Sequence, residues 1–80
     1  MVIEVYSWIN KQRIKEIMEY HDQLQFEKDL MLRKLSGTLV GYKIYDNMDM
    51  EHFNELSETK RNNWSPTRSD FDKDAFINGV

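Results

Sequence analysis

The chain has no cysteine and very little glycine or proline. Its 80 residues include three glycines and one proline. Without cysteine, the protein can form no disulfide, thiolate metal site or thiol nucleophile. The glycines stand at positions 37, 41 and 79, so no glycine-rich loop exists to hold a phosphate group. The lack of cysteine fits a reducing compartment, and we expect the protein to be cytoplasmic.

Long hydrophobic runs and blocks of like charge are missing as well. No apolar run approaches the length of about 20 residues that a membrane-spanning helix needs. Residues 1–5 lack the basic start and the apolar core of a signal peptide, so we expect neither export nor a membrane location. The net charge of −3 argues against a nucleic-acid binder, and the sequence contains no basic arm.

What the chain does contain is typical of a packed globular protein. Hydrophobic residues make up 40%, charged residues 31% and aromatic residues 12%. This aromatic content argues against disorder, and 80 residues are near the lower size limit for one hydrophobic core. We therefore expect a single domain over residues 1–80.

Residues 7–37 show the clearest periodicity. Apolar side chains recur three, four or seven positions apart, at Ile14, Ile17, Met18, Leu24, Met31, Leu32 and Leu35. This spacing predicts one long amphipathic helix whose apolar stripe faces the core. The end of this helix is well marked, because Arg33 and Lys34 suit the negative end of the dipole and Ser36-Gly37 suits a helix C-terminus.

Two features of this region leave alternatives open. Residues 2–6 are mostly β-branched or aromatic and form either a short strand or a backward extension of the helix. Asp22 with Gln25 could be a capping box that starts a second helix, although we favour one continuous helix. Phe26 and Leu30 lie off the main stripe and form a second apolar strip, which predicts a helix packed on two sides.

Residues 38–45 are the best strand candidate in the chain. Val40, Tyr42 and Ile44 share one face if the side chains alternate as they do in a strand. Gly41, in the middle of this segment, indicates a bulge or a close approach of two backbones.

The rest of the chain favours helices. We expect one helix over 50–61 with Asp49 as its N-cap, and a short helix over 70–77 with Ser69 as its N-cap. The predicted fold class is α+β, with one long helix, two short strands and one or two shorter helices. The alternative is an all-α fold.

One group of residues has the composition of a metal site. Asp49, His52 and Glu55 recur at intervals of three, so a helix places them on one face. Such ligands could hold a divalent metal in a metal-dependent enzyme. Their spacing matches no known metalloenzyme motif, and acidic residues are common in a first helical turn because the dipole favours them. We therefore expect no metal and no cofactor, and the lack of a nucleophile with its base predicts no enzymatic activity.

Two basic groups support a nucleic-acid-binding regulator as an alternative function. Lys11, Arg13 and Lys15 lie close to the aromatic Trp8, and Lys60 begins a second basic and aromatic segment that ends at position 68. Cations of this kind contact phosphates, and neighbouring aromatic rings stack on bases. A solvated helix surface is the simpler interpretation of the first group. For the second group, the simpler interpretation is that Trp64 closes the core beneath the loop.

The favoured interpretation is a non-enzymatic interaction module, a small cytosolic regulator or inhibitor that binds another protein. A helix of about 30 residues would be about 45 Å long, whereas a globule of this size has a radius of gyration of about 12 Å. Some apolar surface should therefore stay exposed, which predicts a homodimer or another protein partner. The expected contact residues are Trp8, Phe26, Leu30, Arg61, Trp64 and Arg68. The composition resembles that of small accessory proteins of bacteriophages, although no motif carries this resemblance.

Overall fold

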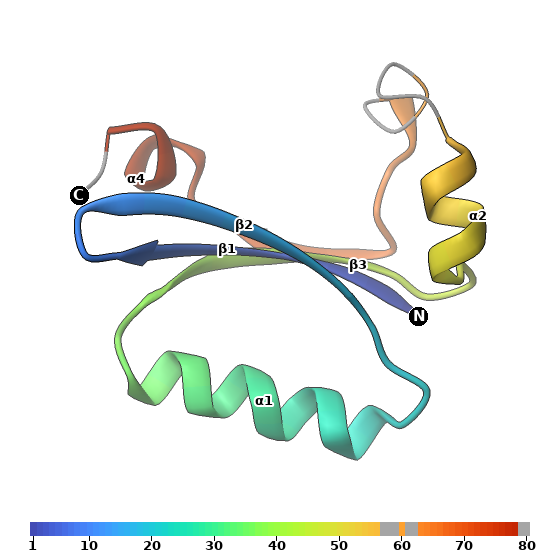
Figure 1. Cartoon of the computed structure of the whole chain (residues 1–80), viewed down its shortest axis with the longest axis horizontal. Helices are drawn as coiled ribbons and strands as arrows, with labels where there is room; N and C mark the ends of the chain where they lie inside the picture. The colour runs from blue at the N-terminus through green and yellow to red at the C-terminus, as the bar shows by residue number, and fades with distance from the viewer. Residues whose placement is uncertain (57–59, 61–62, 79–80) are drawn as a thin grey trace.

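The protein forms one antiparallel sheet with helices on both faces (Figure 1). The structure, a computed structural model, describes residues 1–56, 60 and 63–78. Its elements are β1 (Val2–Ile9), β2 (Gln12–Glu19), α1 (Gln23–Leu35), β3 (Leu39–Tyr45), α2 (Met50–Glu55), β4 (Arg68–Phe71) and α4 (Lys73–Asn78). The strand order is β2-β1-β3-β4, with α1 over one face and α2 and α4 over the other. The predicted α+β class is confirmed, and the all-α alternative is wrong.

The first half of the predicted long helix is instead a β-hairpin. β1 pairs with β2 along their whole lengths, from Val2 opposite Glu19 to Ile9 opposite Gln12. Asn10 and Lys11 form the two-residue turn, with φ of 52° and 63°. Two consecutive positive φ angles define the turn that matches the twist of a hairpin. The strand interpretation of residues 2–6 is therefore confirmed, and the continuous helix over 7–37 is wrong.

Helix α1 begins after Asp22, where the less favoured capping-box alternative places the start of a separate helix. Asp22 is its N-cap, and the Asp22 carboxylate accepts a hydrogen bond of 2.9 Å from the Leu24 amide. The predicted end is confirmed, because α1 stops at Leu35 and Gly37 follows with a φ of +74°. Only the second half of the predicted helix, 13 residues long, is helical.

The sequence predicts that the stripe containing Leu24 and Leu35 faces the core. In the structure, the opposite side of α1 faces the core. Phe26 is 4% exposed and packs with β1 and β3, and Leu30 packs against the same cluster. Leu24 and Leu35, from the predicted inner stripe, are 74% and 78% exposed. The weaker apolar strip therefore faces the sheet, and the stronger stripe faces away from it.

Strand β3 confirms both properties inferred for Gly41. Tyr6 of β1 pairs with Gly41 and Ser7 pairs with Leu39, so Val40 is the extra residue of a bulge. A Cβ atom on Gly41 would lie 2.3 Å from the Asp70 carbonyl oxygen of β4. Only glycine lets β4 approach this closely.

The C-terminal elements partly follow the sequence prediction. Asp49 caps α2 as predicted, with its carboxylate 2.7 Å from the His52 amide, but α2 ends at Glu55. Most of the remaining part of the predicted helix over 50–61 lies outside the described residues. Ser69 belongs to strand β4 and caps no helix, and Asp72 instead accepts the Ala75 amide at 3.0 Å at the start of α4.

Two hydrophobic clusters lie on opposite faces of the sheet. The cluster under α1 contains Ile3, Val5, Phe26 and Ile44. The cluster under α2 contains Val2, Tyr45, Met48 and Phe53. Strand β1 lies between β2 and β3 and supplies buried side chains to both clusters. In the described part of the chain, no helix is long and apolar enough to cross a membrane.

Candidate functional site

The side of α1 that points away from the sheet carries an unusual amount of exposed apolar surface. Its large side chains are Leu24 (74% exposed), Met31 (62%), Leu32 (55%) and Leu35 (78%). Their spacing of seven, eight and eleven residues from Leu24 places them on one side of the helix. We call this surface the outer face of α1. No other described helix lies on this side of the sheet (Figure 1).

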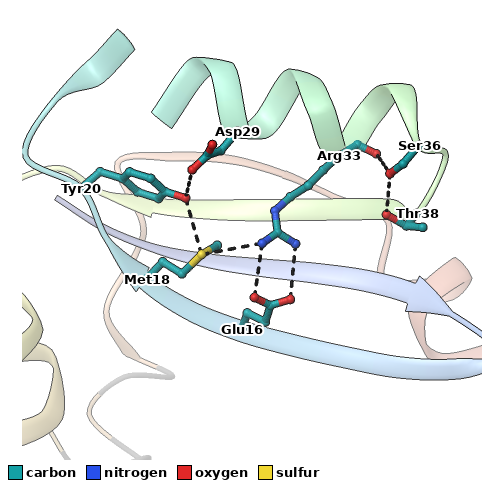
Figure 2. A network of polar contacts seen from close by, with 7 residues as sticks. All are labelled: Glu16, Met18, Tyr20, Asp29, Arg33, Ser36 and Thr38. Carbon is teal, nitrogen blue, oxygen red and sulfur yellow. Dashed lines mark hydrogen bonds and ion pairs between the residues drawn. The ribbon is translucent and has the colours of Figure 1, made fainter. Parts of the chain in front are cut away.

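The inner side of α1 holds the helix firmly on the sheet. Arg33 donates two hydrogen bonds to the Glu16 carboxylate of β2, at 3.3 and 3.2 Å (Figure 2). At the middle of the helix, Asp29 accepts a hydrogen bond of 2.7 Å from the Tyr20 hydroxyl. Paired hydrogen bonds between guanidinium and carboxylate fix orientation as well as distance. These contacts, together with buried Phe26, present the outer face in a defined orientation.

A shallow groove runs between α1 and the end of β2, beside the outer face. Its volume is about 380 Å³, and its lining residues are Met18, Tyr20, Asp29, Leu32, Arg33 and Ser36. Leu32 belongs both to the groove and to the outer face, so the apolar surface continues into a polar border. Burial, followed by the hydrogen bond to Asp29, raises the pKa of Tyr20 to about 12. The phenol therefore stays neutral at physiological pH and acts as a hydrogen-bond donor.

A second polar cluster is buried on the opposite face of the sheet. Glu4 is 5% exposed, and its carboxylate accepts hydrogen bonds from the Tyr6 and Tyr45 hydroxyls, the latter at 3.1 Å. Burial, with a smaller contribution from Glu4, raises the pKa of Tyr6. The Lys43 ammonium lies 5.8 Å from the Tyr6 ring centre and 5.6 Å from that of Phe71. Because both phenols already donate to the carboxylate, this cluster serves to position side chains within the fold.

The contact residues inferred from sequence do not form one surface. Phe26 is in the core, and Leu30 is partly buried beside it. Trp8 is partly buried near the end of β1. Phe26 is therefore closed to a partner, whereas Trp8 and Leu30 keep part of their surface exposed. The exposed apolar residues of α1 lie on the other side of the helix from Phe26 and Leu30.

The remaining predicted contact residues lie elsewhere on the molecule. Trp64 is 47% exposed, and its ring centre is 6.1 Å from that of His52. Arg68 donates to the Asp46 carboxylate at 3.0 Å. Arg61 lies outside the described residues. Sequence periodicity correctly groups the residues of the outer face on one side of α1. The prediction that this side faces the core is wrong, because the opposite side does.

Only some of the basic residues predicted for nucleic-acid binding lie on the same surface. Lys11 is in the hairpin turn, and Arg13 and Lys15 project from the same face of β2. Arg13 donates a hydrogen bond of 2.5 Å to the Ile77 carbonyl oxygen, so its guanidinium joins β2 to α4. Lys60 is exposed and follows α2 in the chain.

The metal-site alternative receives no geometric support. The Asp49 carboxylate already accepts the His52 amide as a helix cap. Within residues 1–56, 60 and 63–78, no three His, Asp or Glu side chains come together in a way that could hold a metal ion.

No protein-family model, curated protein or solved structure matches this chain.

Proposed function

We propose that the protein is a non-enzymatic interaction module, a small cytosolic regulator or inhibitor that binds another protein through the outer face of α1. The observation that carries this proposal is the exposure of Leu24, Met31, Leu32 and Leu35 on one side of one helix. Water contact with contiguous apolar surface is unfavourable, and a partner that covers it removes this cost.

The shape of the surface favours a helical partner. α1 contains 13 residues and is the only described helix on its face of the sheet (Figure 1). Apolar side chains spaced along one helix face pack well against a similar row on a second helix. Polar residues at the borders, among them Glu27 and Lys34, supply charges of both signs that can select a partner.

The alternatives have less support. Nucleic-acid binding through β2 would use Arg13, whose guanidinium is bound to α4. Metal-dependent catalysis would use Asp49, whose carboxylate caps α2. The outer face of α1, by contrast, has no role within the described fold that would explain its apolar character.

The proposal can be tested by affinity capture with three matched proteins. The double variant Leu24→Glu/Leu35→Glu places charges on the outer face, and Ile77→Gln removes a similarly exposed apolar side chain (48% exposed) from α4. Because all three side chains are exposed, each variant should keep the free energy of unfolding within about 0.5 kcal/mol of wild type.

We expect the wild type and Ile77→Gln to retain the same partner protein, and the double variant to retain at least about tenfold less of it. The mixture of proteins used in the capture experiment also contains a second copy of this chain with a different tag. Equal retention by all three folded proteins would contradict a binding role for the outer face.

A further inference from the structure

We infer that the outer face of α1 pairs with the outer face of a second copy of this chain, with the two helices antiparallel. This inference rests on the proposed function and names its partner. Two features of α1 support it: the spacing of the outer-face residues and the positions of the charges beside them.

The residues along the middle of the outer face follow the spacing of a helix–helix seam. They are Leu24, Lys28, Met31 and Leu35, at intervals of four, three and four. This is the spacing by which two helices interlock their side chains in a coiled coil. Three of the four are apolar, and the fourth is a lysine whose long aliphatic stem can cover apolar surface while its ammonium reaches water.

The lysine in this seam distinguishes the two possible orientations. In a parallel pair, Lys28 would face Lys28 of the second copy, and two like charges would meet inside the contact. In an antiparallel pair centred between positions 29 and 30, Lys28 faces Met31 of the second copy. Leu24 then faces Leu35 of the second copy, so both ends of the seam are apolar pairs.

The charges on one border of the seam favour the same orientation. Glu27 and Lys34 lie on the same side of α1, seven residues apart. In the antiparallel pair, Glu27 of each copy lies opposite Lys34 of the other, which gives two symmetric ion pairs. In a parallel pair, Glu27 and Lys34 would instead face the other border of the second helix. That border carries Gln25 and Leu32.

Both charges are available for such pairs. Glu27 accepts one hydrogen bond from the Gln23 amide group at 3.2 Å, and this contact is exposed. Among the residues that the structure describes, neither Glu27 nor Lys34 takes part in an ion pair within the chain.

The contact should be weak because it is small. A helix of 13 residues is about 20 Å long at 1.5 Å per residue. One helix from each copy buries less surface than a stable interface needs, so we expect a dissociation constant on the order of micromolar or weaker.

Cysteine cross-linking tests the orientation, because the natural chain contains no cysteine. We compare Leu24→Cys alone, Leu35→Cys alone and an equimolar mixture of the two under mild oxidation. In the antiparallel pair, position 24 meets position 35, whereas the two copies of position 24 are about 16 Å apart along the helices. We therefore expect a disulfide-linked dimer only in the mixture.

Other cross-linking results would overturn the inference. Dimers of Leu24→Cys alone would indicate a parallel pair, and dimers of the control Ile77→Cys at the same rate would indicate random collision. No cross-link in any sample would show that the occupant is not a second copy. If capture of another protein still depends on Leu24 and Leu35 in that case, the proposed function stands and only this inference fails.

Charge reversal tests the border independently. Glu27→Lys should weaken the dimer about tenfold in sedimentation analysis, because two attractive pairs become repulsive. The double variant Glu27→Lys/Lys34→Glu restores opposite charges between copies and should recover dimerisation. Unchanged association of Glu27→Lys, or failure of the double variant to recover it, would contradict the antiparallel pairing.

Discussion

Tyr20 connects the hairpin to helix α1 through both its ring and its hydroxyl. The hydroxyl donates to Asp29 at 2.7 Å (Figure 2). The centre of the Tyr20 ring is 5.8 Å from that of the Phe26 ring. Deprotonation would place a negative charge beside the Asp29 carboxylate in a partly buried site. Removal from water and this neighbouring carboxylate therefore both favour the neutral phenol.

The raised pKa of Tyr20 predicts a loss of stability in alkali. The folded protein holds the phenol proton up to a pKa of about 12, whereas the ordinary value is 10.0. Unfolding therefore releases a proton in this interval, and the stabilisation is complete below pH 10 and lost as the pH rises towards 12.

Urea unfolding at a series of alkaline pH values measures this effect. Tyr20→Phe should flatten the decline in the free energy of unfolding between pH 10 and 12 relative to wild type. An identical decline in the two proteins would show that Tyr20 does not contribute to it.

Single residues also show why part of the structure was not predictable from sequence. Glu4 is one charge within a strand of apolar residues, and its sequence gives no sign that it is buried. One of its two donors is Tyr45, which is 41 positions away and comes close only because β1 pairs with β3. A buried carboxylate that is satisfied across strands depends on register, which local sequence does not encode.

Among the elements, β4 depends on a single glycine of β3. Gly41→Ala would place a Cβ atom 2.4 Å from the Phe71 Cα atom and closer still to the Asp70 carbonyl oxygen. These neighbours are backbone atoms, so β4 must move and its pairing with β3 must weaken. We expect a loss of about 2–3 kcal/mol in the free energy of unfolding, measured by urea titration.

Gly37→Ala is the matched control for this substitution. Gly37 has a φ of +74°, but nothing lies within 4 Å of the position of an added Cβ. Its substitution should cost only the backbone strain, about 1 kcal/mol. If the two variants lose equal stability, the close approach of β4 is not what requires glycine at position 41.

The elements that sequence predicted correctly have local signals. The end of α1, the cap of α2 and strand β3 each depend on neighbouring residues such as Gly37 and Asp49. The hairpin was missed because β2 lies in a sheet that is covered on both faces. Ile17 packs in the cluster under α2 and Met18 in the cluster under α1, so apolar residues point both ways. Such a strand loses its period of two and resembles a helix.

The buried and exposed sides of α1 are predicted the wrong way round for a related reason. Apolar residues occupy both sides, and the side with more of them is exposed. Periodicity measures how apolar residues are spaced, but which side of the helix is buried depends on the rest of the fold. The outer face could therefore be located from sequence, although its exposure could not.

For the whole molecule, β1 is the centre of stability. It pairs with β2 on one side and β3 on the other, and it supplies buried side chains to both clusters. β4, by contrast, pairs with β3 over four residues and is mostly exposed. Local opening should therefore occur far more readily at β4 and α4 than at β1.

Native-state hydrogen exchange tests this gradient. Amides of β1 should exchange only through global unfolding, whereas those of β4 and α4 should exchange at least about tenfold faster. The slope of exchange with added denaturant separates global opening from local opening. Uniform protection of β1, β4 and α4 would show instead that the chain opens as one cooperative unit.

Under the proposed function, natural selection acts on the inner side of α1 through folding and on its outer side through partner binding. Substitution of Phe26 disturbs the core, whereas substitution of Leu24 or Leu35 leaves the core contacts intact. A lineage that carries this fold can therefore change the outer side of the helix step by step while every intermediate still folds. Partner choice can evolve faster than architecture in such a protein, because an altered contact does not require a repaired core.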